Sequence, residues 1–212
     1  MFPGMVNIAI VSDNQDPDGY NRIRVYFPHL EGSQVSNWIP YVSPMIGNGI
    51  GLSFLPEVDT PVITISLDKY STKMIALPGP YTQVHKPPKT EENSDADLNQ
   101  NGKNDLHFIK SKSGNQVIFD DTEGEEKVQL LSSDKGSRFE FDTKEELINL
   151  ETDKNYAVEA KEDIKLSAKN ILVEAEKEFN VSAETFQVKT EKELEISGDK
   201  DLTIKGSGVS LN

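Results

Sequence analysis

The residues of this sequence that could do chemistry are scattered rather than grouped. Its three histidines, His29, His85 and His107, lie far apart and form neither the HExxH nor the HxxEH spacing of zinc enzymes. No serine lies in the GxSxG pattern of a hydrolase nucleophile. The 36 Asp and Glu residues could always supply two carboxylates for glycoside cleavage, but we interpret them as solvated faces interleaved with lysine. We therefore expect no catalytic residue, no cofactor and no enzyme.

One stretch has the spacing of a calcium loop. Oxygen-bearing side chains occupy its places 1, 3, 5 and 9, namely Asp97, Asn99, Asn101 and Asp105. Gly102 takes place 6, as in an EF-hand, but Phe108 takes place 12, where an EF-hand has a bidentate Glu. We favour the alternative interpretation, a polar turn rich in Asn and Asp, over a calcium site.

Composition excludes several classes of partner. A net charge of −14 makes nucleic acid and anionic membrane surfaces poor partners. The chain has no cysteine, so disulfides and thiol chemistry are excluded. The opening Met1-Phe2-Pro3 has neither the basic nor the apolar region of a signal peptide. We expect a protein that is made in the cytoplasm and assembled into a larger particle.

The C-terminal third of the chain has a sequence pattern that repeats every seven or eight residues, and this repeat organises the rest of the architecture. The units open at Ile148, Tyr156, Ile164, Ile171, Phe179, Phe186, Leu194, Leu202 and Val209. In each unit the first and third places are apolar, and the fifth is small in the seven units from Tyr156 to Leu202. The other places are mostly Lys, Glu, Asp and Asn.

Two secondary structures compete for this repeat. The Glu, Lys, Ala and Leu content favours a long helix. However, residues two apart point to opposite sides of a helix and to the same side of a strand. Most apolar places hold β-branched or aromatic residues, which favour strands. We therefore predict short strands separated by corners.

The length of the unit indicates how many chains take part. Eight extended residues reach only about 26 Å, too little to close a turn around an apolar core. Three units, one from each of three chains, could make a triangular layer. We therefore predict an intertwined trimeric β-helix, or β-prism, with folding and trimerisation as one event. The predicted trimer core comprises Ile164, Leu166, Ile171, Val173, Phe179, Val181, Phe186, Val188, Leu194, Ile196, Leu202 and Ile204.

The N-terminal part differs in kind, because all eleven prolines lie at or before Pro88. Alternating apolar residues predict short strands between Gly and Pro turns. The predicted strands are Val6–Val11, Arg22–Phe27, Trp38–Val42, Gly51–Phe54, Val62–Ile65 and Met74–Leu77. Such a set favours a small antiparallel barrel, and residues 13–19 (DNQDPDG) read as its first turn.

Three motifs of this part recur together in one family. Residues 16–28 (DPDGYNRIRVYFP), 37–45 (NWIPYVSPM) and 49–58 (GIGLSFLPEV) resemble the OB-fold domain of phage baseplate spike proteins and VgrG proteins. The sequence departs from the family at Asp59, where the family has Gly, and around Asp68, where the family has Gly-Asp-Pro. The barrel has aromatic residues but no basic groove, so we do not expect it to bind nucleic acid as many OB-folds do.

The resemblance continues after a polar linker. Residues 107–124 (HFIKSKSGNQVIFDDTEG) are similar to the neck of the same family, and the apolar pairs Val128/Leu130 and Phe139/Phe141 follow. We thus expect an all-β chain with an OB-fold domain (1–85), a linker (86–106), a neck leading into the β-helix (107–147) and an octad-repeat needle (148–212).

The resemblance implies a structural role: a homotrimeric central spike of a contractile injection system, phage tail or tailocin. Its barrel end would meet a baseplate hub protein, and its needle would contact the target envelope transiently. A separate PAAR-type tip protein would dock on Val209, Ser210, Leu211 and Asn212. The family's His-x-His tip metal site is not expected, because no histidine follows His107.

Two other functions compete with the spike. A trimeric β-solenoid adhesin or receptor-binding fibre would share the prism, but we would expect it to carry an export signal or a receptor-binding knob. An enzyme acting on glycans would need a catalytic constellation, and no such constellation is recognisable in the sequence.

Overall fold

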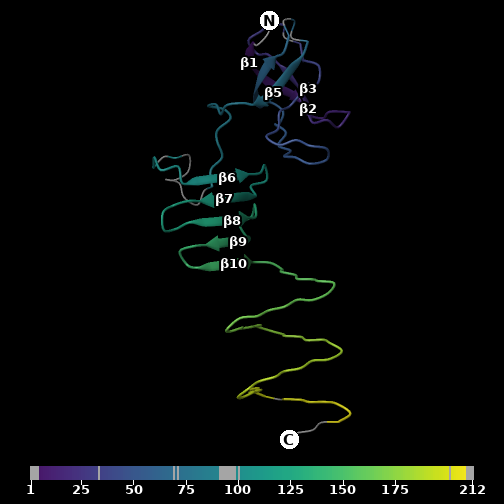
Figure 1. Ribbon diagram of the computed structural model, residues 1–212, viewed down its shortest axis with the longest axis vertical. Coiled ribbons are helices and arrows are strands. Elements are labelled where there is room, and N and C mark those ends of the chain that lie inside the picture. The colour runs from purple at the N-terminus through teal and green to yellow at the C-terminus, as the bar shows by residue number, and fades with distance from the viewer. Residues whose placement is uncertain are drawn as a thin grey trace. The chain divides into compact units, whose positions relative to one another are not determined.

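The computed structural model describes residues 5–32, 34–68, 70, 72–90, 99, 101–200 and 202–208. Its ten strands are all antiparallel to their neighbours and form two five-stranded sheets. The chain divides into two units, Met1–Ala157, which contains both sheets, and Val158–Asn212. The described residues therefore confirm the all-β prediction for the first unit (Figure 1).

The first sheet curls into a nearly closed barrel. Its strands are β1 (Val6–Asp13), β2 (Arg22–Tyr26), β3 (Ile39–Pro40), β4 (Pro61–Ser66) and β5 (Met74–Pro78). They lie in the order β3-β2-β1-β4-β5. The ends of this order meet where Tyr41 bridges Ala76 and the Val42 amide donates to the Ala76 carbonyl at 2.8 Å. The barrel predicted from alternation is thus confirmed.

One predicted strand is wrong. Residues Gly51–Phe54 form no strand, and this stretch contributes only the isolated bridge between Ile46 and Gly51. Gly51 has a φ of 152°, and a Cβ there would lie 2.6 Å from the Met45 carbonyl oxygen. The apolar alternation of this stretch therefore belongs to a loop that folds back on itself, not to the barrel wall.

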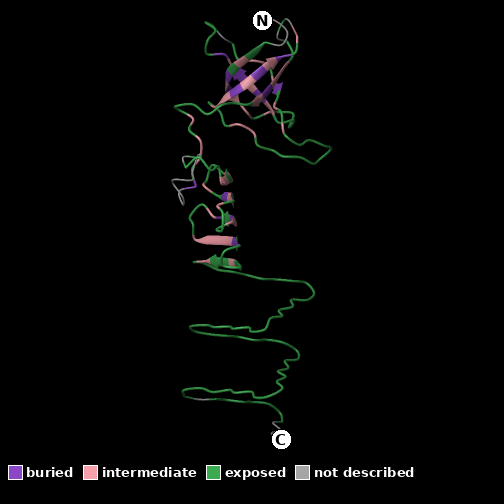
Figure 2. Cartoon of the chain, turned by 60° about the vertical axis from the view of Figure 1, so that its left-hand side comes forward, coloured by how far each residue is buried: buried purple, intermediate pink, exposed green. Residues whose placement is uncertain are grey.

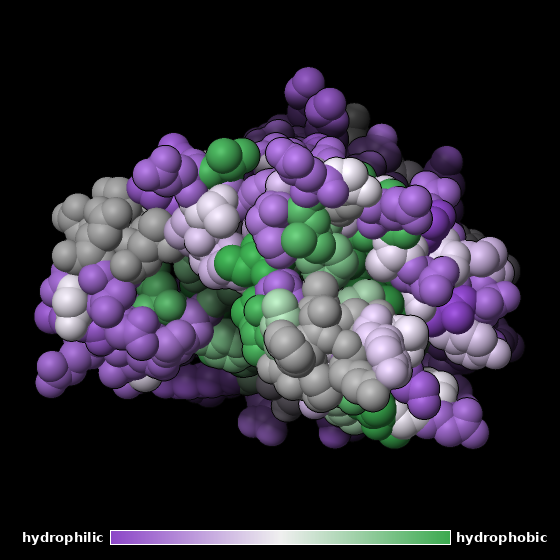
Figure 3. Space-filling model, turned by 90° about the horizontal axis from the view of Figure 1, so that it is seen from above, coloured by the Kyte–Doolittle hydropathy of each residue, from purple (hydrophilic) through white to green (hydrophobic). Residues whose placement is uncertain are grey.

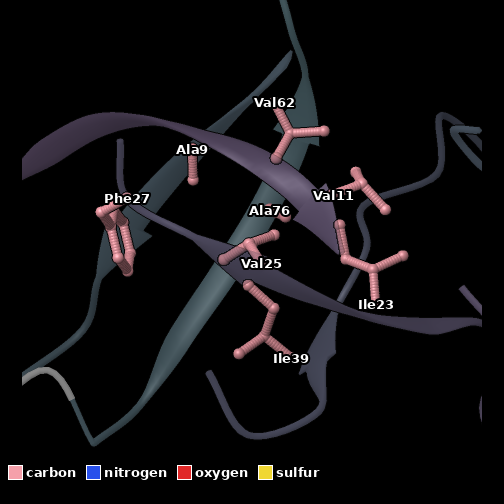
Figure 4. Packing of buried hydrophobic residues seen from close by; sticks show 8 residues of the cluster. All are labelled: Ala9, Val11, Ile23, Val25, Phe27, Ile39, Val62 and Ala76. Atoms are coloured by element: carbon pink, nitrogen blue, oxygen red, sulfur yellow. The ribbon is translucent and has the colours of Figure 1, made fainter. Parts of the chain in front are cut away.

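The barrel core is small and almost entirely aliphatic. Alternate residues of the strands point inward, as the burial pattern of β4 shows by its strict alternation. The buried cluster consists of Ala9, Val11, Ile23, Val25, Phe27, Ile39, Val62 and Ala76 (Figure 4). Five of these eight residues come from β1 and β2 or directly follow β2, so this hairpin forms the larger part of the core.

Carboxylates organise two turns of the barrel. Arg22 Nε and Nη2 donate to the two Asp16 carboxylate oxygens at 2.9 and 2.6 Å, and the Asp16 side chain is only 3% exposed. This bidentate pair holds the pKa of Asp16 well below its usual range. In the β4–β5 turn, Asp68 accepts hydrogen bonds from Thr72 Oγ1 and from the amides of Tyr70, Thr72 and Lys73, which lower its pKa. A single carboxylate thus orders the turn where the sequence departs from the family.

The second sheet is a meander of consecutive hairpins. Its strands are β6 (Leu106–Lys110), β7 (Gln116–Asp120), β8 (Lys127–Leu131), β9 (Ser137–Asp142) and β10 (Leu147–Thr152), in the order β10-β9-β8-β7-β6. The predicted pairs Val128/Leu130 and Phe139/Phe141 lie in β8 and β9. The pair Ile148/Leu150, which opens the octad repeat in the sequence, lies in β10 opposite Phe141 and Phe139.

The second unit has a different character. Its described residues form neither a strand nor a backbone hydrogen bond, and every one of them is exposed. Its described residues run extended through successive wide turns (Figure 1), and Figure 2 shows these residues as exposed. Among the described residues of the whole chain, no helix is long and apolar enough to cross a membrane.

Candidate functional site

The described residues contain no group of three or more His, Cys, Asp and Glu side chains that could hold a metal ion. His29 makes an edge contact with the Phe27 ring, and His107 Nε2 lies 3.9 Å from an Asp121 carboxylate oxygen. Neither contact places a histidine beside a nucleophile, so the geometry gives no support to catalysis at either residue.

The stretch with calcium-loop spacing is only partly described. Asp97 lies outside the described residues. Asn99 Oδ1 accepts the Asn104 amide at 2.6 Å, and Asn101 Oδ1 accepts the Lys103 amide at 3.1 Å. Two of the four candidate oxygens are therefore used to order the backbone of a polar turn.

The strongest candidate for function is one face of the second sheet. Residues directly opposite each other in antiparallel strands point to the same side, so the strand register defines two rows that are apolar except for His107. One row consists of His107, Phe119, Val128, Phe141 and Ile148, and the other of Ile109, Val117, Leu130, Phe139 and Leu150. We call these ten residues the apolar sheet face.

The apolar sheet face is open to solvent in the single chain. Seven of its side chains are between 36% and 65% exposed: Ile109, Phe119, Val128, Leu130, Phe141, Ile148 and Leu150. The Phe139 and Phe141 rings pack edge to face with centroids 5.0 Å apart. A groove of about 440 Å³ runs over the second row, lined among others by Val117, Leu130 and Phe139. Such a contiguous apolar surface is typical of an interaction site.

The opposite face of the sheet is more buried and mixes apolar side chains, such as Ile118 and Leu131, with polar ones, several of which pair with one another. Lys127 Nζ lies 2.7 Å from an Asp142 carboxylate oxygen, which raises the pKa of Lys127 and lowers that of Asp142. Gln129 Nε2 donates to Glu140 Oε2 at 2.5 Å, and both side chains are buried. The two faces therefore differ in exposure, and the apolar sheet face is the more open to solvent.

The second unit also exposes its apolar pairs. The twelve residues of the predicted trimer core are between 53% and 74% exposed in the single chain. They are Ile164, Leu166, Ile171, Val173, Phe179, Val181, Phe186, Val188, Leu194, Ile196, Leu202 and Ile204. The single chain buries none of them, and its backbone groups in this unit have no partners among the described residues.

The predicted tip interface cannot be compared with the structure. Val209, Ser210, Leu211 and Asn212 lie outside the described residues. It remains a prediction.

Sequence reasoning underestimated how far the exposed apolar surface extends toward the N-terminus. The predicted core began at Ile164, and the pairs Val128/Leu130 and Phe139/Phe141 were expected in the neck that leads to it. The register extends these pairs into two rows that start in β6, with Ile109 and Phe119 among the exposed members. The signal was present as apolar residues two apart, but hairpin loops of different lengths separate these pairs. Only the strand register shows that the pairs lie in line.

The comparisons with known proteins concern the barrel. Residues 7–81 match the family model described as the Type VI secretion system/phage-baseplate injector OB domain. This match spans β1 to β5 and covers less than half of the 212 residues. No curated protein matches the chain. The nearly closed barrel is consistent with the OB-fold of this family, which points to a structural role in a baseplate.

Proposed function

We propose that this protein is the homotrimeric central spike of a contractile injection machine, such as a phage tail, a tailocin or a secretion-system baseplate. The OB barrels form the base of the spike. The C-terminal repeats of three chains wind into a rigid needle that pierces the target envelope. Its role is mechanical, and no step of it needs catalysis.

Two observations support this function from different parts of the chain. The barrel matches a family of baseplate injector domains, which associates the chain with baseplate components. Independently, the second unit combines a strict apolar repeat with a backbone that forms no hydrogen bond to itself among the described residues. A chain of this kind needs a partner that supplies both strand edges and apolar contacts.

The exposed apolar pairs are the observation that carries the proposal. Each pair contributes roughly 3–6 kcal/mol once both of its side chains are buried. One chain alone obtains neither the burial nor the hydrogen bonds. Copies of the same chain offer an identical repeat in register, so association supplies both together.

Three copies fit the repeat better than two. A seven- or eight-residue unit spans one wall of a layer, and three walls are the fewest that enclose an apolar interior. The apolar sheet face of β6–β10 would then line the first layers of the same interior. The remaining charged places would face solvent, where the net charge of −14 on each copy keeps assembled needles soluble.

Partners follow from the two ends of the proposed spike. A baseplate hub protein would meet the OB barrels. A PAAR-type tip protein would cap the three C-terminal ends at Val209–Asn212. Contact with the target envelope would be brief, during sheath contraction.

The proposal is tested in the cells that produce the protein. Particles with a contractile sheath are purified, and an antibody against residues 1–81 locates the chain by electron microscopy. We expect label at the baseplate and three copies per particle by quantitative mass spectrometry. Label spread along a fibre, or on the producing cell's surface, would instead support an adhesin and refute the spike.

A further inference from the structure

The loop between β3 and β4 is unusual in a strongly charged protein. Residues 37–56 (NWIPYVSPMIGNGIGLSFLP) contain no charged side chain, although charged residues make up 27% of the chain. The middle of this stretch projects from the barrel as a loop, drawn in blue in Figure 1. We call residues 43–54 the apolar finger.

The apolar finger has a defined structure. The Ser43 hydroxyl lies 2.6 Å from the Leu52 carbonyl oxygen and 3.0 Å from that of Met45, so its single proton is shared between the two limbs of the finger. The Leu52 amide donates to the Met45 carbonyl at 3.1 Å, and a β-bridge joins Ile46 to Gly51. The Ile50 side chain lies over Gly47, where an added Cβ would meet its Cγ1 at 2.5 Å. The finger is therefore ordered before any partner binds.

The finger presents large apolar side chains to solvent. Five of them are exposed, from 46% at Leu52 to 83% at Ile46: Met45, Ile46, Ile50, Leu52 and Phe54. The face of the molecule seen from above mixes hydrophilic residues with patches of hydrophobic ones (Figure 3). An ordered, uncharged projection of this kind is typical of an interface rather than of a solvated loop.

A second apolar feature lies at the base of the finger. A pocket of about 160 Å³ is lined by uncharged residues only: Asn21, Tyr41, Val42, Ser43, Pro44, Leu52, Ser53, Phe54, Leu55 and Pro78. Apolar cavities of roughly 150 Å³ accept a guest the size of benzene. The pocket therefore has room for one branched aliphatic side chain, such as the exposed Ile46 or Ile50.

We propose that the finger of one copy inserts into the base pocket of the next copy, so that three barrels close into a ring. This inference rests on the proposed trimer and assigns a contact between its barrels. A ring needs two different, complementary patches on each subunit. The apolar finger is one of these patches, and the pocket at its base is the other. The tip of the finger would carry Ile46 or Ile50 into the neighbour's pocket and place the other at its rim.

Charge favours a second copy as the occupant. Two copies that each carry −14 repel one another over most of their surfaces. The finger and the pocket contain no charge on either side, so here two copies can meet without burying an unpaired ion. The proposed needle also holds the three barrels at a high effective concentration, so a contact of modest area is sufficient.

The absence of cysteine makes the contact accessible to disulfide trapping. In the full-length chain, Ile46→Cys is combined with Ser53→Cys, and the protein is oxidised mildly at low concentration. A finger in the neighbouring pocket links three chains in a closed ring, so we expect a covalent trimer on a non-reducing denaturing gel. Each single-cysteine variant should remain monomeric on the same gel.

A charge at the tip of the apolar finger should slow the formation of the disulfide between copies. Adding Ile50→Glu to the double-cysteine chain places a carboxylate in an apolar pocket, and we expect covalent trimer to form at least about tenfold more slowly. The matched control is Val84→Glu, which charges an exposed valine outside the finger and should leave trapping unchanged.

The outcomes separate this contact from the proposed spike. If sedimentation in reducing buffer shows a trimer but the double variant gives only monomer bands, the finger contact is wrong and the spike stands. Trapping between two Ile46→Cys single variants would mean that fingers meet each other, and would also refute the contact. A monomeric sedimentation mass would remove the proposed trimer itself.

Discussion

Adjacent leucine-sized residues in one repeat unit should respond differently to the same truncation. Ile171 opens its unit, and Leu172 takes the second place, which faces the opposite side of a strand. In the single chain both are exposed, 56% for Ile171 and 81% for Leu172. Ile171→Ala and Leu172→Ala remove the same number of carbon atoms. We expect only Ile171→Ala to weaken the proposed trimer.

The expected difference is large because the trimer contains each substitution three times. Truncating a buried isoleucine to alanine costs about 2–5 kcal/mol, hence about 6–15 kcal/mol for three copies. At about 1.4 kcal/mol per factor of ten, the lower bound already weakens the trimer about 10⁴-fold. An exposed substitution such as Leu172→Ala changes stability by no more than about 0.5 kcal/mol.

Sedimentation equilibrium over a range of protein concentrations measures the association of the two variants. Thermal melts followed by circular dichroism at the same concentrations measure their stability. Ile171→Ala should dissociate at concentrations where Leu172→Ala and the parent chain remain trimeric. Equal behaviour of the two variants would refute the assignment of the first and third places to a buried interior.

Other predictions concern the barrel. Asp59 adopts a φ of 70°, so Asp59→Gly should raise the free energy of unfolding by about 0.5–1 kcal/mol, measured by urea denaturation; a loss of stability would contradict the strain at this turn. Ile23 is one of the two largest fully buried side chains among the described residues, so Ile23→Ala should lower the free energy of unfolding by about 2–5 kcal/mol. We expect the unfolding transition of the barrel not to depend on protein concentration. The pKa values of Asp16 and Asp68 are lowered by their hydrogen bonds, so the stability that they contribute is present above about pH 4 and is lost as the pH falls further. Lowering the pH should therefore reduce the free energy of unfolding of the parent chain more steeply than that of Asp16→Asn. Identical pH profiles of the two proteins would contradict the role of the Asp16 carboxylate.

Much of the barrel could be predicted because its strands and turns are marked by residues that are close together in the sequence. Strict alternation in Val62–Ile65 appears as the alternating burial of β4, and the predicted first turn has Gly19 at a φ of 73°. The strand predicted at Gly51–Phe54 failed for a physical reason. Its alternation serves a folded-back loop whose apolar residues face solvent, and sequence alone does not distinguish such a loop from a barrel strand.

The candidate surfaces were harder to predict because they depend on strand pairing across loops. Nothing local shows that Phe119 lies in line with Val128 and Phe141, since the hairpin loops between them differ in length. The strand register aligns them. Conversely, the regular spacing of the C-terminal repeat made its apolar places visible in the sequence, because no loop interrupts them.

The mass of the purified protein in solution tests the trimeric needle most directly. Sedimentation velocity in dilute neutral buffer, without detergent, should give one species with three times the 23.6 kDa mass of the chain. Circular dichroism of the same sample should show β-structure and little helix. A well-folded monomer, or a strongly helical spectrum from residues 148–212, would contradict the proposed association.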